Sequence, residues 1–133
     1  SNQNVLSFDV SDFDVSFVRG LSLKDGVTTL TDFTASIIGS SLTSILSNFK
    51  NKIPKVLVCG GGRKNKVLIE KIKKNTLPEI IIQSIDDYGV DGDYVESRAF
   101  AFLAIRSIKK LPISFPDTTG CTKPVSGGEI IEY

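Results

Sequence analysis

The sequence has no methionine, no histidine and no tryptophan, and only two cysteines among its 133 residues. Because histidine is absent, the chain can hold neither a Ser-His-Asp nor a Cys-His catalytic set, and no histidine-ligated metal. Translated proteins begin with methionine, whereas this chain begins Ser1-Asn2-Gln3. We therefore expect a processed chain or a piece of a longer protein, with residues 1–3 as a tag remnant. Cys59 and Cys121 are too few for a disulfide framework, which favours reduced thiols in the cytoplasm.

An excess of one charge and long apolar runs are also missing. The chain has 16 basic and 15 acidic residues, a net charge of +1, which argues against nucleic-acid binding through bulk charge. No run approaches the roughly 18 apolar residues that a membrane helix needs, and the first twenty residues do not form a secretory signal. With 41% hydrophobic and 23% charged residues, the composition is typical of one globular domain, residues 1–133, with enough chain for a core.

The apolar pattern predicts an α/β fold, because helical and extended periods alternate along the chain. The expected main elements are a long helix from the Ser22–Asp25 capping box to before Pro54, a strand at 55–59, a helix at 65–75, a strand at 79–85 and a helix at 93–110. Weaker signals predict a short helix at 14–19 and an edge strand at 129–133. The strand at 55–59 reads as buried on both faces, and the helix at 65–75 is expected to turn Val67, Leu68 and Ile72 inward.

The strand–helix–strand segment is typical of a parallel βαβ unit. Ligands in such folds lie beyond the carboxyl ends of the strands. Any site is therefore expected in the two loops that follow the strands, residues 60–65 and 86–93.

The first loop is rich in glycine and is followed by a helix. Gly60, Gly61 and Gly62 would let the backbone approach a ligand, and Arg63 and Lys64 add positive charge. The pattern is neither a dinucleotide fingerprint nor a Walker A loop. Two interpretations stay open, a nucleotide-binding loop and a strand-to-helix turn that needs a positive φ.

The second loop is acidic. Read as an EF-hand from Asp87, it has Gly89 at position 3 and Arg98 at position 12, where a glutamate is needed, so calcium binding is not predicted. Asp93 can instead cap the next helix with Glu96 as its capping-box partner. The alternative is that Glu96 presents its carboxylate at the mouth of the site, as an acceptor or base.

Other notable residues have simpler interpretations. A set of five lysines lacks the interleaved aromatic residues that nucleic-acid binding would need, so it indicates a solvated helix face. The set is Lys64, Lys66, Lys71, Lys73 and Lys74. The phenylalanines, among them Phe33, Phe49, Phe100 and Phe102, are expected in the core. Cys59 lies next to a helix start, which can lower a thiol pKa, so a thiol or redox protein is a third hypothesis.

Five segments, in the same order, resemble anhydro-N-acetylmuramic acid kinases. The residues Val56 to Gly62 with Asn65 and Leu68 resemble the family's V-C-G-G-G-x-x-N-x-x-L, and Val95 to Ala104 resemble V-E-A-x-A-F-A-W-L-A, with Ser97 and Phe102 in place of the commoner Ala and Trp. Similar likenesses join Leu111 to Cys121 with L-P…P-x-T-T-G-A, Gly127 to Ile131 with G-G…I, and Leu30 to Ala35 with T-L-T-x-x-T-A. The resemblance covers nearly the whole chain.

The resemblance implies one lobe of the actin-like ATPase and sugar kinase fold, in a bacterial cytoplasmic enzyme of cell-wall recycling. Such a kinase uses ATP and Mg²⁺ to convert 1,6-anhydro-N-acetylmuramic acid to N-acetylmuramic acid 6-phosphate, as water opens the anhydro bridge. Carried over by position, Gly60, Gly61, Gly62 and Asn65 would cradle the adenosine side of the nucleotide, and Glu96 would face the sugar.

The resemblance also implies that the chain is only the carboxyl-terminal, nucleotide-side part of such a kinase. The phosphate-binding turns and the catalytic aspartate of the family belong to the amino-terminal lobe, so we expect no catalytic residue here and little activity from the chain alone. The alternative is a non-enzymatic nucleotide-binding or dimerisation module, and a homodimer stays open under either hypothesis.

Overall fold

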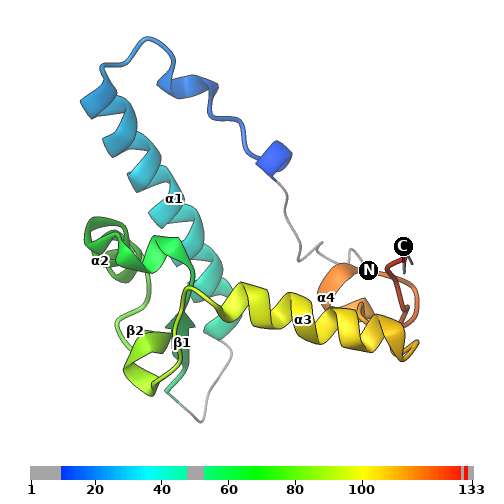
Figure 1. Ribbon diagram of the computed structural model, residues 1–133. Helices are drawn as coiled ribbons and strands as arrows, with labels where there is room; N and C mark the ends of the chain where they lie inside the picture. Colours follow the sequence, from blue (N-terminus) through cyan, green and yellow to red (C-terminus); the bar gives the residue numbers. More distant parts are fainter. Residues whose placement is uncertain (1–9, 48–52, 130, 132–133) are drawn as a thin grey trace. The chain divides into compact units, whose positions relative to one another are not determined.

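The computed structural model describes residues 10–47, 53–129 and 131, and Figure 1 shows their helices and strands. The helices are α1 (Leu23–Leu46), α2 (Lys66–Lys74), α3 (Val95–Ile108) and α4 (Pro116–Thr119), and the strands are β1 (Lys55–Val58) and β2 (Ile81–Ser84). Short 3₁₀ helices lie at Val10–Asp12, Ser16–Val18, Gly61–Lys64 and Ile85–Tyr88. The α/β class is confirmed, and the five main elements appear in the predicted order with shorter ends. The chain divides into two compact units, Val15–Val95 and the described residues outside it, and each is treated by itself.

Helix α1 begins at the predicted capping box. The Ser22 hydroxyl accepts a hydrogen bond from the Asp25 backbone N–H at 3.1 Å and donates one to the Asp25 carboxylate at 2.7 Å. The helix ends at Leu46, before the predicted stop at Pro54. Its buried residues are Ala35 and Gly39 rather than the larger apolar ones. Small residues are needed there because the end of α2 packs closely against α1.

The predicted short helix at 14–19 is a single 3₁₀ turn, Ser16–Val18, which is followed by Gly20 at a φ of 84°. Its Phe17 ring lies 5.0 Å from the Phe33 ring of α1, centroid to centroid. This aromatic pair attaches the segment before α1 to the helix itself.

Strands β1 and β2 pair in parallel, with Val56 opposite Ile82 and Leu57 opposite Gln83, and α2 connects them. The predicted βαβ unit is therefore confirmed (Figure 1). The core of this unit lies between the sheet and the helices α1 and α2. Its buried apolar residues are Ala35, Ile72, Ile80 and Ile82.

Two burial predictions for this unit are wrong. The Leu57 side of β1 is open, with Leu57 44% exposed, because α1 and α2 pack only on the Val56 and Ile82 side. Val67 was expected inside but is 55% exposed, and Ile69 packs against the core instead. A strand of continuous apolar residues predicts two covered faces, whereas the described helices cover one.

The second unit is built on α3 and an irregular tail. Arg106 of α3 donates a hydrogen bond from Nε to the Pro112 carbonyl at 2.6 Å, and the Ser107 hydroxyl donates one to the Gly127 carbonyl. An antiparallel bridge joins Ser114 to Val125. These bonds fold the tail back along the last turns of α3.

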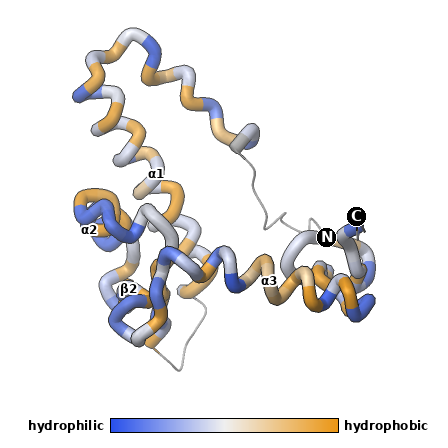
Figure 2. Tube along the Cα trace, viewed as in Figure 1, coloured by the Kyte–Doolittle hydropathy of each residue, from blue (hydrophilic) through white to orange (hydrophobic). Residues whose placement is uncertain are grey.

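Hydrophobic residues recur along α3, as the orange stretches of this helix in Figure 2 show, and several of their side chains are exposed. Phe100 is 63% exposed and Phe102 is 59% exposed, so their predicted place in the core is wrong. The Arg106 guanidinium lies 5.5 Å from the centre of the Phe102 ring and screens part of it. The prediction for Phe49 and most of the predicted 129–133 strand lie outside the described residues. Among the described helices, none combines the length and the apolar character that crossing a bilayer requires.

Candidate functional site

The glycine loop follows β1 and opens the connection to α2. Gly60 has a φ of 74°, which favours glycine, so the interpretation as a turn with positive φ is correct for this residue. Gly61 and Gly62 begin a 3₁₀ turn and are exposed. A Cβ atom added to Gly60 or Gly61 would meet no atom within 4 Å. The backbone of this loop is therefore open to the approach of a ligand.

Asn65 is the N-cap of α2. Its side-chain oxygen accepts a hydrogen bond from the Leu68 backbone N–H at 3.1 Å. This bond uses the amide oxygen within the fold and leaves the side-chain nitrogen as the group of Asn65 that can reach a ligand.

The acidic loop follows β2 and is organised by Asp86. The Asp86 carboxylate accepts hydrogen bonds from the Ser84 hydroxyl at 2.6 Å and from the Gly92 backbone N–H at 3.0 Å. The Asp86 backbone N–H in turn donates to the Ser84 hydroxyl at 3.2 Å. The first part of the predicted loop is a 3₁₀ helix, Ile85–Tyr88, that ends at the left-handed Gly89.

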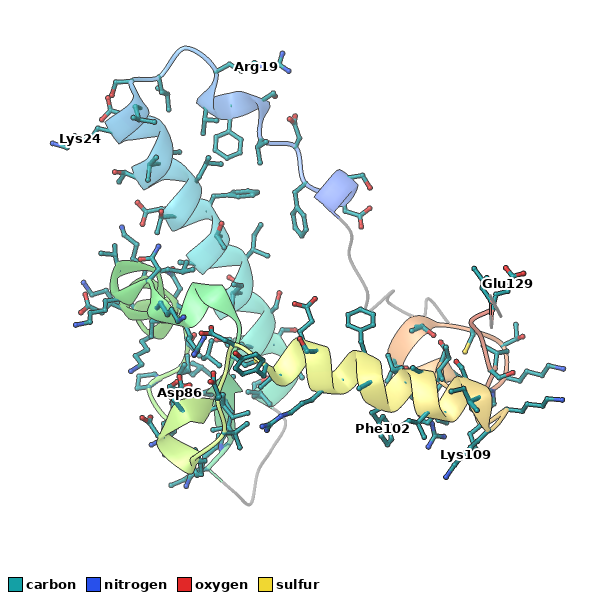
Figure 3. The ribbon with its side chains drawn as sticks, in the orientation of Figure 1. Arg19, Lys24, Asp86, Phe102, Lys109 and Glu129 are labelled. Carbon is teal, nitrogen blue, oxygen red and sulfur yellow. The ribbon has the colours of Figure 1, made fainter. Side chains whose placement is uncertain are left out.

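Arg63 joins the two loops. Its Nε lies 2.6 Å from Asp86 Oδ2 and its Nη2 lies 3.1 Å from Asp86 Oδ1, while Nη1 lies 2.5 Å from Asp93 Oδ1. The Arg63 side chain is only 7% exposed. The neighbouring Lys64 reaches the other oxygen of Asp93 at 2.5 Å. Figure 3 shows Asp86 among the charged side chains at this edge of the unit.

These pairs stabilise the charged forms of their members. The Arg63 guanidinium, helped by the Ser84 hydroxyl and the Gly92 N–H, holds the pKa of Asp86 well below its usual range. Hydrogen bonds from Arg63 and Lys64 also lower the pKa of Asp93. Hydrogen bonds to Asp86 and Asp93 raise the pKa of Arg63 in return. Arg63, Asp86 and Asp93 are therefore charged at neutral pH.

Two sequence-based interpretations are corrected here. Arg63 and Lys64 were expected to offer positive charge to a ligand, but carboxylates of the second loop neutralise both. Asp93 was expected to cap α3, but the helix begins at Val95 and the Asp93 carboxylate is held by Arg63 and Lys64. Sequence reasoning missed this network. The signal for it was a pair of cations in one loop and four aspartates in the other.

The predicted site residues fall into two groups. Gly60, Gly61, Gly62 and Asn65 lie together in one segment, and Arg63 joins this segment to Asp86 and Asp93 of the second loop. Glu96 is exposed in the first turn of α3 and belongs to the other compact unit. The structure thus brings the two predicted loops together at the carboxyl ends of β1 and β2. Glu96 is not part of this group, because it belongs to the other compact unit.

A pocket of about 370 Å³ opens beside this network. It has an apolar part from Val58, Ile69 and Ile82, and a polar part from Arg63, Lys73, Gln83, Ser84 and Asp87. Its volume and mixed lining fall within the range of small-molecule sites.

The remaining candidate groups are the Cys59 thiol, the lysines of α2 and possible metal ligands. Cys59 is an exposed free thiol directly before the glycine loop, and the thiol hypothesis stays a prediction. Lys73 and Lys74 are exposed, as a solvated helix face requires, whereas Lys71 pairs with Asp32 of α1. Within residues 10–47, 53–129 and 131, no cluster of cysteine, aspartate and glutamate side chains has the arrangement of a metal site.

Comparison with known proteins identifies the family. The family model described as anhydro-N-acetylmuramic acid kinase matches residues 5–133. The kinase of that name from Pelagibacter ubique is 53% identical over 132 residues, which cover 99% of this chain and 35% of the relative. Its namesake from Zymomonas mobilis is 43% identical over 124 residues, or 93% of this chain and 32% of the relative. A third, from Rhizobium rhizogenes, is 40% identical over 126 residues, or 95% and 32%.

The chain therefore spans about a third of the length of these curated relatives. The range that the family model matches, residues 5–133, includes the glycine loop, the acidic loop and α3. On this evidence, the chain belongs to the anhydro-N-acetylmuramic acid kinase family.

Proposed function

We propose that this chain is the carboxyl-terminal, nucleotide-side portion of an ATP-dependent kinase that converts 1,6-anhydro-N-acetylmuramic acid to N-acetylmuramic acid 6-phosphate. The observation that carries the proposal is a family match over residues 5–133, combined with an open glycine loop at the carboxyl ends of two parallel strands. A bacterial cytoplasmic location in cell-wall recycling, which the family resemblance implies, is part of the same proposal.

The glycine loop supports the nucleotide part of the proposal. Gly60 takes a backbone conformation that favours glycine, and Gly61 has room for a ligand to approach its backbone. Arg63 and Lys64 are committed to aspartates, so the loop is suited to the uncharged nucleoside end rather than to the phosphates. The adjacent pocket offers an apolar surface from Val58, Ile69 and Ile82 on which a base could pack.

The sugar and metal parts of the proposal rest on the family. Glu96 would accept a hydrogen bond from the anhydro sugar, and its carboxylate is exposed for this purpose. Mg²⁺ would accompany the phosphates of ATP, where it neutralises charge during phosphoryl transfer. Because the family's catalytic aspartate and phosphate turns lie in the amino-terminal lobe, the chain alone is proposed to have little or no kinase activity.

Titration calorimetry with ATP tests the nucleotide site. The wild-type chain is expected to bind ATP, and the Gly61→Leu variant is expected to lose binding, because a side chain at Gly61 would fill the space that the ligand needs. The control is Gly26→Leu, since Gly26 lies in α1 and a Cβ there also meets no atom within 4 Å. Circular dichroism should show that both variants fold. Robust turnover of ATP and sugar by the 133-residue chain would contradict the proposed inactivity.

A second candidate function is a non-enzymatic interaction module. The observation in its favour is the exposed apolar surface of α3, which includes Phe100, Ile105 and Ile108. Sedimentation at increasing concentration separates the two candidates. A concentration-dependent dimer that does not bind ATP would favour the module and overturn the kinase half-site.

A further inference from the structure

Arg63 is the centre of a hydrogen-bond ring that closes the glycine loop onto the acidic loop. Arg63 Nη1 donates to the Gly60 carbonyl at 3.0 Å, and its Nε donates to Asp86 at 2.6 Å. The ring is completed by the backbone N–H and carbonyl groups of Gly60 and Gly92. The Gly60 N–H donates to the Gly92 carbonyl at 3.0 Å, and the Gly92 N–H donates to Asp86 at 3.0 Å. Both backbone groups of Gly60 are thus held by this ring.

The ring holds a conformation that the loop would leave easily. Gly60 combines a φ of 74° with a ψ of 179°, a region that is almost restricted to glycine, and glycine has many other conformations available. The loop backbone is exposed at Gly61 and Gly62, so packing does little to fix it. Within the loop, the Arg63 backbone N–H donates to the Gly60 carbonyl at 3.3 Å and the Asn65 N–H donates to the Gly62 carbonyl at 3.1 Å. The bonds that hold Gly60 from outside its own 3₁₀ turn are the one from the Arg63 side chain and the one to Gly92.

Arg63 is also poorly placed to bind a phosphate. Its Nε and both Nη atoms face carboxylates, with Asp91 as a third one 3.8 Å from Nη2. Its side chain is 7% exposed. A phosphate would have to displace an ionised aspartate from a forked, two-bond pairing with the guanidinium.

We propose that Arg63 is a positioning residue of the nucleotide site, which holds the Gly60–Gly62 backbone in its binding conformation and is not itself a phosphate ligand. This inference rests on the proposed function. It predicts that loss of Arg63 weakens the binding of every ligand of the loop, whether or not the ligand carries phosphates.

The test uses the 133-residue chain with Arg63→Met and Arg63→Lys, and with Arg19→Met as the control, because Arg19 is an exposed arginine of the same compact unit. Amide hydrogen exchange is measured at Gly60–Gly62 without ligand, and ATP and adenosine are titrated separately. In Arg63→Met, exchange at Gly60–Gly62 is expected to rise relative to α2. If the binding-competent loop falls to a tenth of its population, the Kd for ATP and for adenosine should each rise about tenfold.

Arg63→Lys is expected to give intermediate values, because an ammonium keeps the charge but cannot form the forked pairing. If Arg63→Met fails to fold, the same exchange and titration measurements are made on Arg63→Lys alone. A Kd that rises for ATP but not for adenosine would make Arg63 a phosphate ligand and overturn the inference. Unchanged exchange at Gly60–Gly62 in both variants would overturn it as well. Absence of ATP binding by the wild-type chain is a different result, because it overturns the proposed function. The exchange measurements would still test whether Arg63 holds the backbone of Gly60–Gly62.

Discussion

Gly92 leaves the space that the Arg63 side chain occupies. A Cβ atom on Gly92 would lie 2.4 Å from Arg63 Nε, 2.7 Å from Cζ and 2.8 Å from Cδ. Gly92 is buried, and its N–H and carbonyl bind Asp86 and Gly60. Position 92 must therefore be glycine because a Cβ there would collide with a side chain 29 positions earlier in the sequence. A positive φ is not the reason.

Substitution of Gly92 by alanine should displace the guanidinium of Arg63. We expect Gly92→Ala to lower the free energy of unfolding by about 1–3 kcal/mol, the usual cost of overpacking. Urea denaturation measures this change. Gly61→Ala is the control in the first loop, because a Cβ there meets no atom within 4 Å. An equal loss in both variants would show that the close approach at Gly92 has no energetic effect.

The pairing of Arg63 with Asp86 should depend on pH in the acid range. The pKa of Asp86 is lowered in the folded state, so its contribution to stability is complete above the carboxyl pKa of the unfolded chain, about 4. That contribution is lost as the pH falls from there toward the folded-state pKa. A double-mutant cycle with Arg63→Met and Asp86→Asn should give a constant coupling energy from about pH 6 to 8 and a smaller one below about pH 4. A coupling energy that does not change with pH would contradict an ionic pairing.

The contact between α1 and the end of α2 should tolerate no side chain at Gly39. A Cβ on Gly39 would lie 2.6 Å from both the Cβ and the carbonyl oxygen of Asn75, and backbone cannot move aside as a flexible side chain can. Gly39→Ala is expected to cost about 1–3 kcal/mol or more in unfolding free energy. In Gly26→Ala, where an added Cβ in the same helix would meet no atom within 4 Å, the expected change is a gain of up to about 1 kcal/mol from helix propensity. Thermal denaturation of the two variants in parallel tests the prediction, and a gain in both would refute it.

Helix α2 should contribute to the core through Ile72 and not through Val67. Ile72 is 5% exposed and Val67 is 55% exposed. Ile72→Ala should therefore cost about 2–5 kcal/mol, whereas Val67→Ala should change the unfolding free energy by less than about 0.5 kcal/mol. Chemical denaturation distinguishes them, and similar losses would mean that Val67 is covered in solution.

The order of the elements and the two loops of the candidate site could be predicted from the sequence alone. Helical hydrophobic periods and short continuous apolar runs are local properties, so the strands, α1 and α2 could be predicted from their own residues. The Ser22 and Asn65 caps are also local, because a cap bonds a backbone N–H three residues away. The parallel βαβ topology then placed residues 60–65 and 86–93 at one edge of the sheet.

What the side chains at that edge do could not be predicted in the same way, because it depends on contacts between distant residues. Arg63 pairs with residues 23 and 30 positions away, and the choice of Asp86 and Asp93 over other acids depends on how the two loops meet. The same holds for burial. Val67 and Leu57 have the apolar character of core residues, but exposure is set by which face the helices cover, and that is a property of the packed chain rather than of any segment. The same long-range geometry pairs Arg63 and Lys64, which from the sequence would add positive charge for a ligand, with aspartates of the second loop.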